Sequence, residues 1–289
     1  MSGRFTLILV LLITFFTSCE VINPDEGIPA FVRVDKVDFS VKPGEGTDSV
    51  DISDIWFYVD GKSIGAYEMP VVFPVLESGS HNVELRFGVK LNGIAATRTI
   101  NPFFVFENLN LDFVSGDTIV LKPKTTYDSR VQFVWNSIGQ EGFEEGGISI
   151  DSVAGTTTKI TKTSAEVYEG SFSGQIHLDQ SHTKYIGQSS KKFILPKEGQ
   201  AVVMELHSKN TSNHFAIGMF VEDQSGRITI VNHLVVNPGP EWKKLYVNFT
   251  ELVSHYPQAR SFRVFFTAEL ESSNTTTDIF LDNIKLMHY

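Results

Sequence analysis

Apolar and polar residues alternate along much of the chain after residue 30, and this period of two constrains the fold more than any other feature of the sequence. The run from Phe31 to Phe39 keeps the alternation for most of its length, as a half-buried strand does. A helix needs apolar residues at a period of about 3.6, and that spacing is hardly visible in this chain. The sequence therefore predicts an all-β protein, with one short helical turn over residues 251–256.

Two turn signals organise the strands of the first half. Asp60-Gly61 follows an apolar run over residues 55–59, and Asn92-Gly93 follows a longer run over residues 81–91. Both dipeptides tolerate the positive φ angles that two-residue hairpin turns require. Together with the short runs that follow, they predict an N-terminal Ig-like β-sandwich over residues 30–136.

The second half begins after a glycine-rich acidic stretch, residues 136–147, which predicts a domain boundary. A new series of strand-like runs then extends from residue 158 to residue 287. Their number and spacing suit a jelly roll. We therefore predict a C-terminal jelly-roll β-sandwich over residues 137–289.

Residues 1–18 have the form of a signal peptide that ends at the only cysteine. Arg4 precedes an apolar run over residues 5–16, which is shorter than the about 20 residues that span a membrane as a helix. The Phe-Thr-Ser-Cys string that ends at Cys19 resembles a lipobox, so Cys19 is predicted to be the lipidated first residue of the mature protein. An ordinary secretory peptide, cleaved nearby, is the alternative. Residues 19–29 are predicted to form a tether.

Charge and motif content exclude several function classes. The net charge of −10 argues against nucleic-acid binding, which needs clustered Lys and Arg. The sequence holds no Gly-x-Ser-x-Gly elbow, no His-Glu-x-x-His zinc pair and no Gly-x-x-x-x-Gly-Lys phosphate loop. We therefore predict that the protein is not an enzyme. A hydrolase with an unrecognised pair of carboxylates is the alternative that stays open.

Four stretches of the second half resemble, in their order and spacing, the galactose-binding-like jelly roll that many carbohydrate-binding modules share. They are residues 143–146, 168–176, 241–245 and 279–284. In that family the first and last stretches meet, and acidic residues from them can bind a structural calcium ion, which prefers oxygen ligands. The resemblance implies a calcium site at Glu144, Glu169 and Asp282. Hydrogen bonding at a sheet edge, or exposure to solvent, is the alternative for these acids.

The first half resembles lipoproteins of Bacteroidota that carry small β-sandwiches outward from the membrane. Three Asp-Ser/Thr-aliphatic tripeptides match the O-glycosylation pattern of that phylum, with acceptors at Ser49, Thr118 and Ser152. The resemblance implies a protein that is lipid-anchored in the outer membrane, and surface-exposed rather than periplasmic.

A glycan site needs a flat aromatic face and a few polar groups, because a sugar ring presents both C–H bonds and hydroxyls. Trp242 is expected in the core, since its strand is rich in apolar residues. A ring in the polar stretch 180–190 has no obvious core to fill, so Tyr185 is our first candidate. The predicted ligand-binding residues are Tyr185, Tyr168, Phe172, His177 and Asp179.

The sequence thus predicts a non-catalytic envelope lipoprotein whose jelly roll binds glycan or another surface ligand, with calcium as its possible cofactor. The alternative is a structural or accessory subunit of an outer-membrane assembly for secretion, uptake or gliding, whose partner would be an outer-membrane protein. Exposed aromatic residues in a groove favour glycan binding, and a broad apolar patch favours the subunit role.

Overall fold

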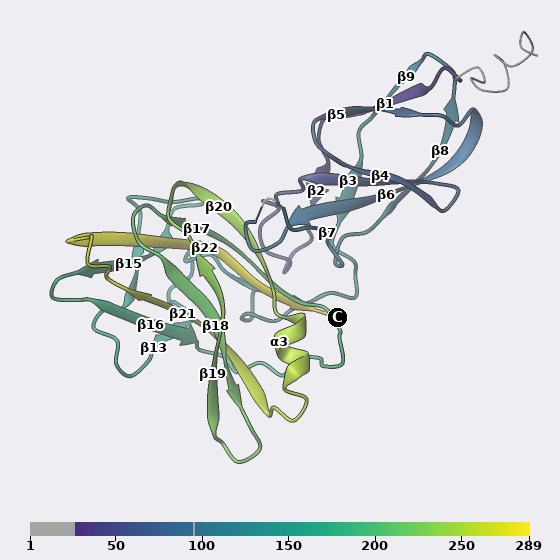
Figure 1. Cartoon of the computed structure of the whole chain (residues 1–289). Coiled ribbons are helices and arrows are strands. Elements are labelled where there is room, and N and C mark those ends of the chain that lie inside the picture. Colours follow the sequence, from purple (N-terminus) through teal and green to yellow (C-terminus); the bar gives the residue numbers. More distant parts are fainter. Residues whose placement is uncertain (1–26, 95) are drawn as a thin grey trace, which may run out of the picture.

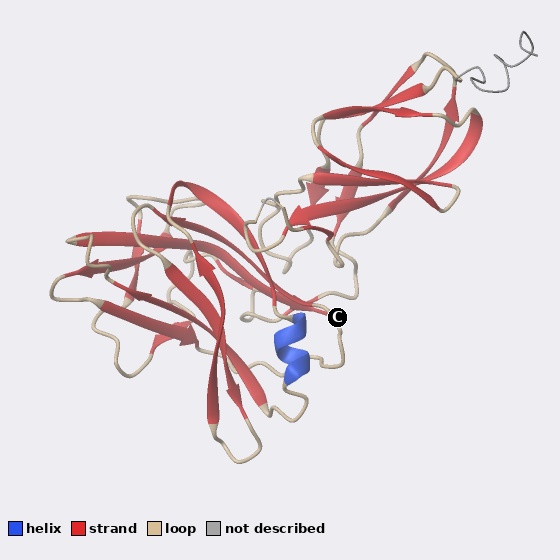
Figure 2. Cartoon of the chain, in the orientation of Figure 1, coloured by secondary structure: helices blue, strands red, loops and turns tan. Residues whose placement is uncertain are grey.

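The computed structural model describes residues 27–94 and 96–289, and this part of the chain is built almost entirely from strands (Figure 1, Figure 2). The predicted all-β class is confirmed. One α-helix lies in the described residues, α3 (Thr250–His255), where the helical turn was predicted. No helix of the described chain is long and apolar enough to cross a membrane. The signal peptide, Cys19 and most of the tether lie outside the described residues.

The strands up to residue 126 form three sheets that enclose one apolar core. A five-stranded sheet has the order β4-β3-β6-β7, with β8 also paired to β6, and it packs beside the sheets β5-β1-β9 and β10-β2. The strands are β1 (Ala30–Val34), β2 (Asp38–Ser40), β3 (Asp54–Val59), β4 (Lys62–Glu68), β5 (Val71–Val75), β6 (Gly79–Lys90), β7 (Arg98–Ile100), β8 (Glu107–Phe113), β9 (Thr118–Leu121) and β10 (Lys124–Thr126).

The strands from residue 132 onward form a sandwich of two sheets. The seven-stranded sheet has the order β14-β15-β22-β17-β20, with β11 and β12 also paired to β22, and the five-stranded sheet has the order β13-β16-β21-β18-β19. The strands are β11 (Gln132–Phe133), β12 (Gln140–Glu141), β13 (Ile150–Ser152), β14 (Ile160–Thr163), β15 (Ser173–Asp179), β16 (Lys184–Ser189), β17 (Val202–Asn210), β18 (Phe215–Glu222), β19 (Ile228–Val236), β20 (Gly239–Asn248), β21 (Ser261–Glu269) and β22 (Thr276–His288).

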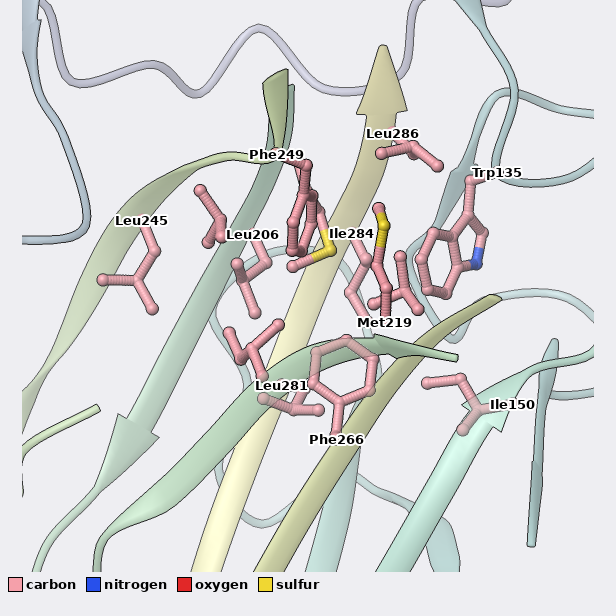
Figure 3. Close-up of a cluster of buried hydrophobic side chains, with 14 of the residues drawn as sticks. Trp135, Ile150, Leu206, Met219, Leu245, Phe249, Phe266, Leu281, Ile284 and Leu286 are labelled. Atoms are coloured by element: carbon pink, nitrogen blue, oxygen red, sulfur yellow. The ribbon is translucent and has the colours of Figure 1, made fainter. Parts of the chain in front are cut away.

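Alternation along each strand of the second sandwich sends one set of side chains into a shared core (Figure 3). On β22, Leu281 points inward and is fully buried, while its neighbour Phe280 faces outward and is only partly buried. Trp135 closes one side of the core and donates its indole N–H to the Ser149 hydroxyl at 2.9 Å. The burial pattern therefore leaves the outer face of each sheet free to carry other residue types.

Both predicted hairpin signals form turns. Asp60 and Gly61 have φ angles of 47° and 78°, and Asn92 and Gly93 have φ angles of 56° and 68°. One of the short runs that follow the second turn, residues 103–106, does not form a strand, since Phe104 makes only an isolated bridge to Tyr127. Both rings are buried there, because this segment fills the core instead of extending a sheet.

The stretch predicted as a boundary, residues 136–147, is folded against the second sandwich. It contains β12, which pairs with β22, and the buried ring of Phe143. We refer below to residues 27–131 as the N-terminal half and to residues 132–289 as the C-terminal half. Whether they are separate domains that divide after residue 136 stays a prediction.

Candidate functional site

The outer face of the seven-stranded sheet carries a group of aromatic side chains that the core does not use. Trp242 lies on β20, Phe280 on β22 and Tyr168 just before β15. The ring centroids of Tyr168 and Trp242 are 5.7 Å apart, and those of Trp242 and Phe280 are 6.3 Å apart. Tyr168 is 40% exposed, and the other two are partly buried. We call these three residues the aromatic ledge.

Trp242 belongs to the ledge because of the parity of β20. Leu245 and Val247 on this strand point into the core, so Trp242, Lys244 and Tyr246 point to the outer face. The expectation that Trp242 is a core residue was therefore wrong. Its indole N–H donates a hydrogen bond to the Glu166 carboxylate at 3.0 Å.

Polar side chains continue the ledge across the sheet. On the neighbouring strands, Gln175 and Lys209 are the direct cross-strand partners of Phe280. The Lys209 ammonium lies 2.8 Å from Glu166, which also accepts from Trp242. These contacts lower the pKa of Glu166, with the hydrogen bond from Lys209 as the largest cause, so the ledge carries a carboxylate and an ammonium side by side.

The Tyr168 ring is held from below and from the side. It stacks on the imidazole of His207, with centroids 3.6 Å apart and planes 15° apart. Its hydroxyl lies 2.8 Å from the hydroxyl of Ser49, which comes from the N-terminal half. His207 is buried, and burial, followed by the nearby Lys244 and Lys285, lowers its pKa to about 2. The ring beneath Tyr168 is therefore neutral at ordinary pH.

A network of buried polar residues lies beside the ledge, between the two halves of the chain. Glu205 is fully buried, with the Lys244 ammonium 3.1 Å and the Tyr127 hydroxyl 3.0 Å from its Oε2. Lys285 is also fully buried, and its ammonium donates to the Thr47 carbonyl and lies 3.4 Å from the Tyr127 hydroxyl. We call these residues, with His207, the junction.

Apolar contacts also join the N-terminal half to the C-terminal half beside the junction. Val203, Tyr246 and Met287 belong to strands of the C-terminal half, but they are buried in the core of the N-terminal half. The Tyr246 hydroxyl accepts from the Asp51 backbone N–H at 2.8 Å. The two halves thus contact each other through apolar packing and through hydrogen bonds that involve buried charged groups.

The structure places the predicted ligand-binding residues in different environments. Tyr185 lies on β16 and is completely buried, and its hydroxyl has no hydrogen-bond partner among the described residues. The prediction that Tyr185 is an exposed stacking platform was therefore wrong. The polar stretch around it is one strand of the five-stranded sheet, and alternation turns this ring inward although its neighbours face solvent.

The other four candidates lie on or beside the seven-stranded sheet. Tyr168 is part of the ledge. His177 is on β15 beside Gln175, with its Nδ1 2.9 Å from Asp278. Asp179 accepts the backbone N–H groups of the next turn, and those bonds lower its pKa. Phe172 is 39% exposed, but it contacts none of the ledge rings and lies near Lys162 instead.

The predicted calcium ligands are only partly brought together. The backbone N–H of Glu169 donates to Asp282 at 3.2 Å, and burial raises the pKa of Asp282 to about 7. Glu144 instead accepts the backbone N–H groups of Ser171 and Phe172. In the described part of the chain, no group of three or more His, Cys, Asp or Glu side chains is placed to hold a metal ion. The calcium site stays a prediction.

The three predicted glycosylation acceptors also differ in accessibility. Thr118 and Ser152 are exposed, whereas the Ser49 hydroxyl is partly buried and hydrogen-bonded to Tyr168. A sugar on Ser49 would have to displace the contact that holds the ledge ring. Modification of Thr118 and Ser152 would meet no such obstacle.

No protein-family model matches this sequence, and no curated protein matches it. Solved structures give distant likenesses. The CBM22-1 xylan-binding domain from Paenibacillus barcinonensis Xyn10C is 15% identical with a TM-score of 0.39, over 52% of this chain and 92% of that one. A carbohydrate-binding module of the β-sandwich superfamily is 12% identical with a TM-score of 0.38, over 84% and 86%. TmCBM61, solved with β-1,4-galactotriose, is 17% identical with a TM-score of 0.34, over 52% and 95%.

Sequence reasoning missed most of the ledge. Phe280 is not among the predicted ligand-binding residues, yet it stands between Ile279 and Leu281, two aliphatic residues of one strand. Since those two face the core, Phe280 must face outward, and this parity was a readable signal. Glu166 and Lys209 gave no comparable signal, because their meeting depends on how the loop before β15 folds over the sheet.

Proposed function

We propose that the protein binds glycans, without catalysis, on the aromatic ledge. The single observation that carries this proposal is the exposed Tyr168 beside Trp242 and Phe280, on an outer sheet face where no core needs them. Rings of this kind stack against the C–H faces of sugars, and their edges need polar groups for the hydroxyls. Glu166, Lys209 and Gln175 supply acceptors and donors at that edge.

The shape of the ledge suits a chain more than a single small molecule. Gln175, Phe280 and Lys209 follow one another across three adjacent strands, with Trp242 on the fourth. Strands in a sheet are about 4.8 Å apart, so this row spans more than one sugar residue. An extended oligosaccharide that crosses the strands would contact each of these side chains in turn.

Tryptophan fluorescence offers a direct test. The chain has three tryptophans, of which Trp135 is buried and Trp56 is in the N-terminal half. A panel of soluble polysaccharides should shift the emission through Trp242. Tyr168→Ala should weaken binding of a positive glycan by more than about 1 kcal/mol, or about fivefold.

Phe106→Ala is the matched control, since Phe106 is an aromatic of similar exposure (38%) in the N-terminal half, under Arg86. It should leave the affinity unchanged. If no glycan in the panel binds, and an outer-membrane β-barrel co-purifies with the native protein, the accessory-subunit role replaces this proposal.

We also propose that a lipid on Cys19 anchors the protein to the outer membrane with the ledge toward the outside of the cell. The lipobox-like string supports this placement. Calcium, if the protein takes it, would bind near Asp282 and Glu169, the two predicted ligands that lie together. A melting temperature that does not respond to calcium or to a chelator would remove calcium from the proposal.

A further inference from the structure

Strand β19 forms one edge of the five-stranded sheet and leaves its outer side without a partner strand. It pairs with β18 over its whole length, from Ile228 to Val236. Among the described residues, no backbone hydrogen bond joins its other side to a further segment. About half of the backbone N–H and C=O groups of this nine-residue strand, those on the side away from β18, therefore face outward along this edge (Figure 1).

The composition of β19 differs from that of the other edges in this chain. Folded proteins protect sheet edges with charged residues or proline, because an open edge can pair with another strand. The other edge strands of five or more residues each carry such protection: Lys62 and Glu68 on β4, Pro74 on β5, Glu107 and Asp112 on β8, and Pro240, Glu241, Lys243 and Lys244 on β20. Strand β19 contains neither a charged residue nor a proline.

Apolar side chains are exposed along the same strand. Ile228, Ile230 and Val235 are 59%, 64% and 59% exposed. Next to them on the sheet face, the partly buried Phe220 packs against Phe265 with ring centroids 4.7 Å apart. The edge thus combines free backbone groups with apolar surface, and both would be covered by one more strand.

We propose that β19 pairs antiparallel with β19 of a second copy of this chain, so that two five-stranded sheets join into one across a two-fold axis. A two-fold contact places the same surface on both sides, so the strand must be compatible with itself. A chain with a net charge of −10 repels its copies over most of its surface. The uncharged β19 is a long edge on which two copies meet without opposing like charges.

Analytical ultracentrifugation of the full chain in detergent, over a wide range of protein concentration, tests the proposal. We expect a reversible monomer–dimer equilibrium. Ile230→Lys introduces the charge that other edges carry, at a side chain already exposed to solvent, so the variant should fold and stay monomeric. Leu76→Lys, which changes a 78% exposed residue of the N-terminal half, should dimerise like the wild type.

Hydrogen exchange separates edge pairing from contact through the sheet face. Pairing of the two edges should slow exchange of outward-facing β19 amides as protein concentration rises, and Ile230→Lys should abolish this effect. A wild-type chain that stays monomeric up to its solubility limit would overturn the proposal. So would a dimer that Ile230→Lys leaves intact, or one whose β19 amides exchange at the same rate at every concentration.

Discussion

Two buried tyrosine hydroxyls in this chain have opposite environments. The Tyr127 hydroxyl donates to the buried Glu205 carboxylate, whereas the Tyr185 hydroxyl lies over Gly187 and has no partner in the described part of the chain. An unpaired polar group costs free energy when it is buried, and loss of a donor leaves its acceptor unpaired. The same substitution should therefore have different effects at the two positions.

Tyr127→Phe should lower the free energy of unfolding by about 1 to 3 kcal/mol, because Glu205 loses a donor inside the junction. Tyr185→Phe should be neutral or stabilising, because it removes a hydroxyl that pays desolvation without a hydrogen bond. Urea unfolding of both variants checks the pair. Equal losses of stability would show that the Tyr185 hydroxyl has a partner, such as a bound water.

His207 and Asp282 should give the protein two opposing pH dependences. Burial lowers the pKa of His207 from 6.5 to about 2, so its contribution to stability is present above pH 6.5 and is lost as the pH falls. Burial raises the pKa of Asp282 from 3.8 to about 7, so its contribution is present below pH 4 and is lost as the pH rises toward 7.

These two effects can be separated by comparing variants. As the pH falls from 7 to 5, the free energy of unfolding of His207→Gln should rise by about 2 kcal/mol relative to that of the wild type, since each pKa unit corresponds to 1.36 kcal/mol. Over the same pH range, the free energy of unfolding of Asp282→Asn should fall by a similar amount relative to that of the wild type. Chemical unfolding at several pH values measures both differences. If the free energy of unfolding of each variant depends on pH as that of the wild type does, these groups titrate normally in the folded protein.

At the scale of single elements, strand alternation predicted more than composition did. Alternation predicted the all-β class, and the Asp-Gly and Asn-Gly dipeptides predicted the two turns, because each of these depends on neighbours in sequence. It did not predict the inward ring of Tyr185 or the outward ring of Trp242. Those two predictions rested on the polarity of the surrounding segment, whereas the side of the sheet that a ring faces depends on its position in the alternation along the strand. Bulges that reset this alternation, as at Ser208 on β17, have no clear sequence signature.

The register shift between β18 and β19 depends on a glycine. The shift lies between Ile217 and Gly218, and a Cβ on Gly218 would overlap the Val231 carbonyl oxygen and the Phe265 ring. Gly218→Ala should cost about 1 to 3 kcal/mol, as overpacking of a tight site does. Gly147→Ala is the control, since a Cβ there meets nothing within 4 Å and should be tolerated. Thermal unfolding of the two variants measures the difference.

At the scale of the whole molecule, the junction could not be predicted from the sequence. Glu205, Lys244 and Lys285 stand in three different strands, and each alone is typical of a solvent-exposed position. Their burial becomes possible only because Tyr127 and Thr47 of the N-terminal half supply hydrogen-bond partners. Contacts between residues far apart in sequence leave no local pattern, so the hydrogen bond between Ser49 and Tyr168 could not be predicted either.

The predicted anchor also belongs to this scale. Cys19→Ser should abolish lipid labelling and release the protein from the membrane fraction, because the lipid is the predicted anchor and the apolar run over residues 5–16 is too short to span a membrane. Metabolic labelling with a fatty-acid analogue and membrane fractionation check both results. Full membrane retention of an unlabelled variant would contradict the anchor.

The hydrogen bond between Ser49 and Tyr168 has a consequence for how such a protein can change over evolutionary time. A domain with its own closed core can be moved to another carrier without loss of its internal contacts. Here a graft of the C-terminal half onto another carrier would uncover the buried Glu205 and Lys285 and leave the Tyr168 hydroxyl unsupported. The two halves are therefore expected to be inherited together, because each covers polar groups that the other leaves buried.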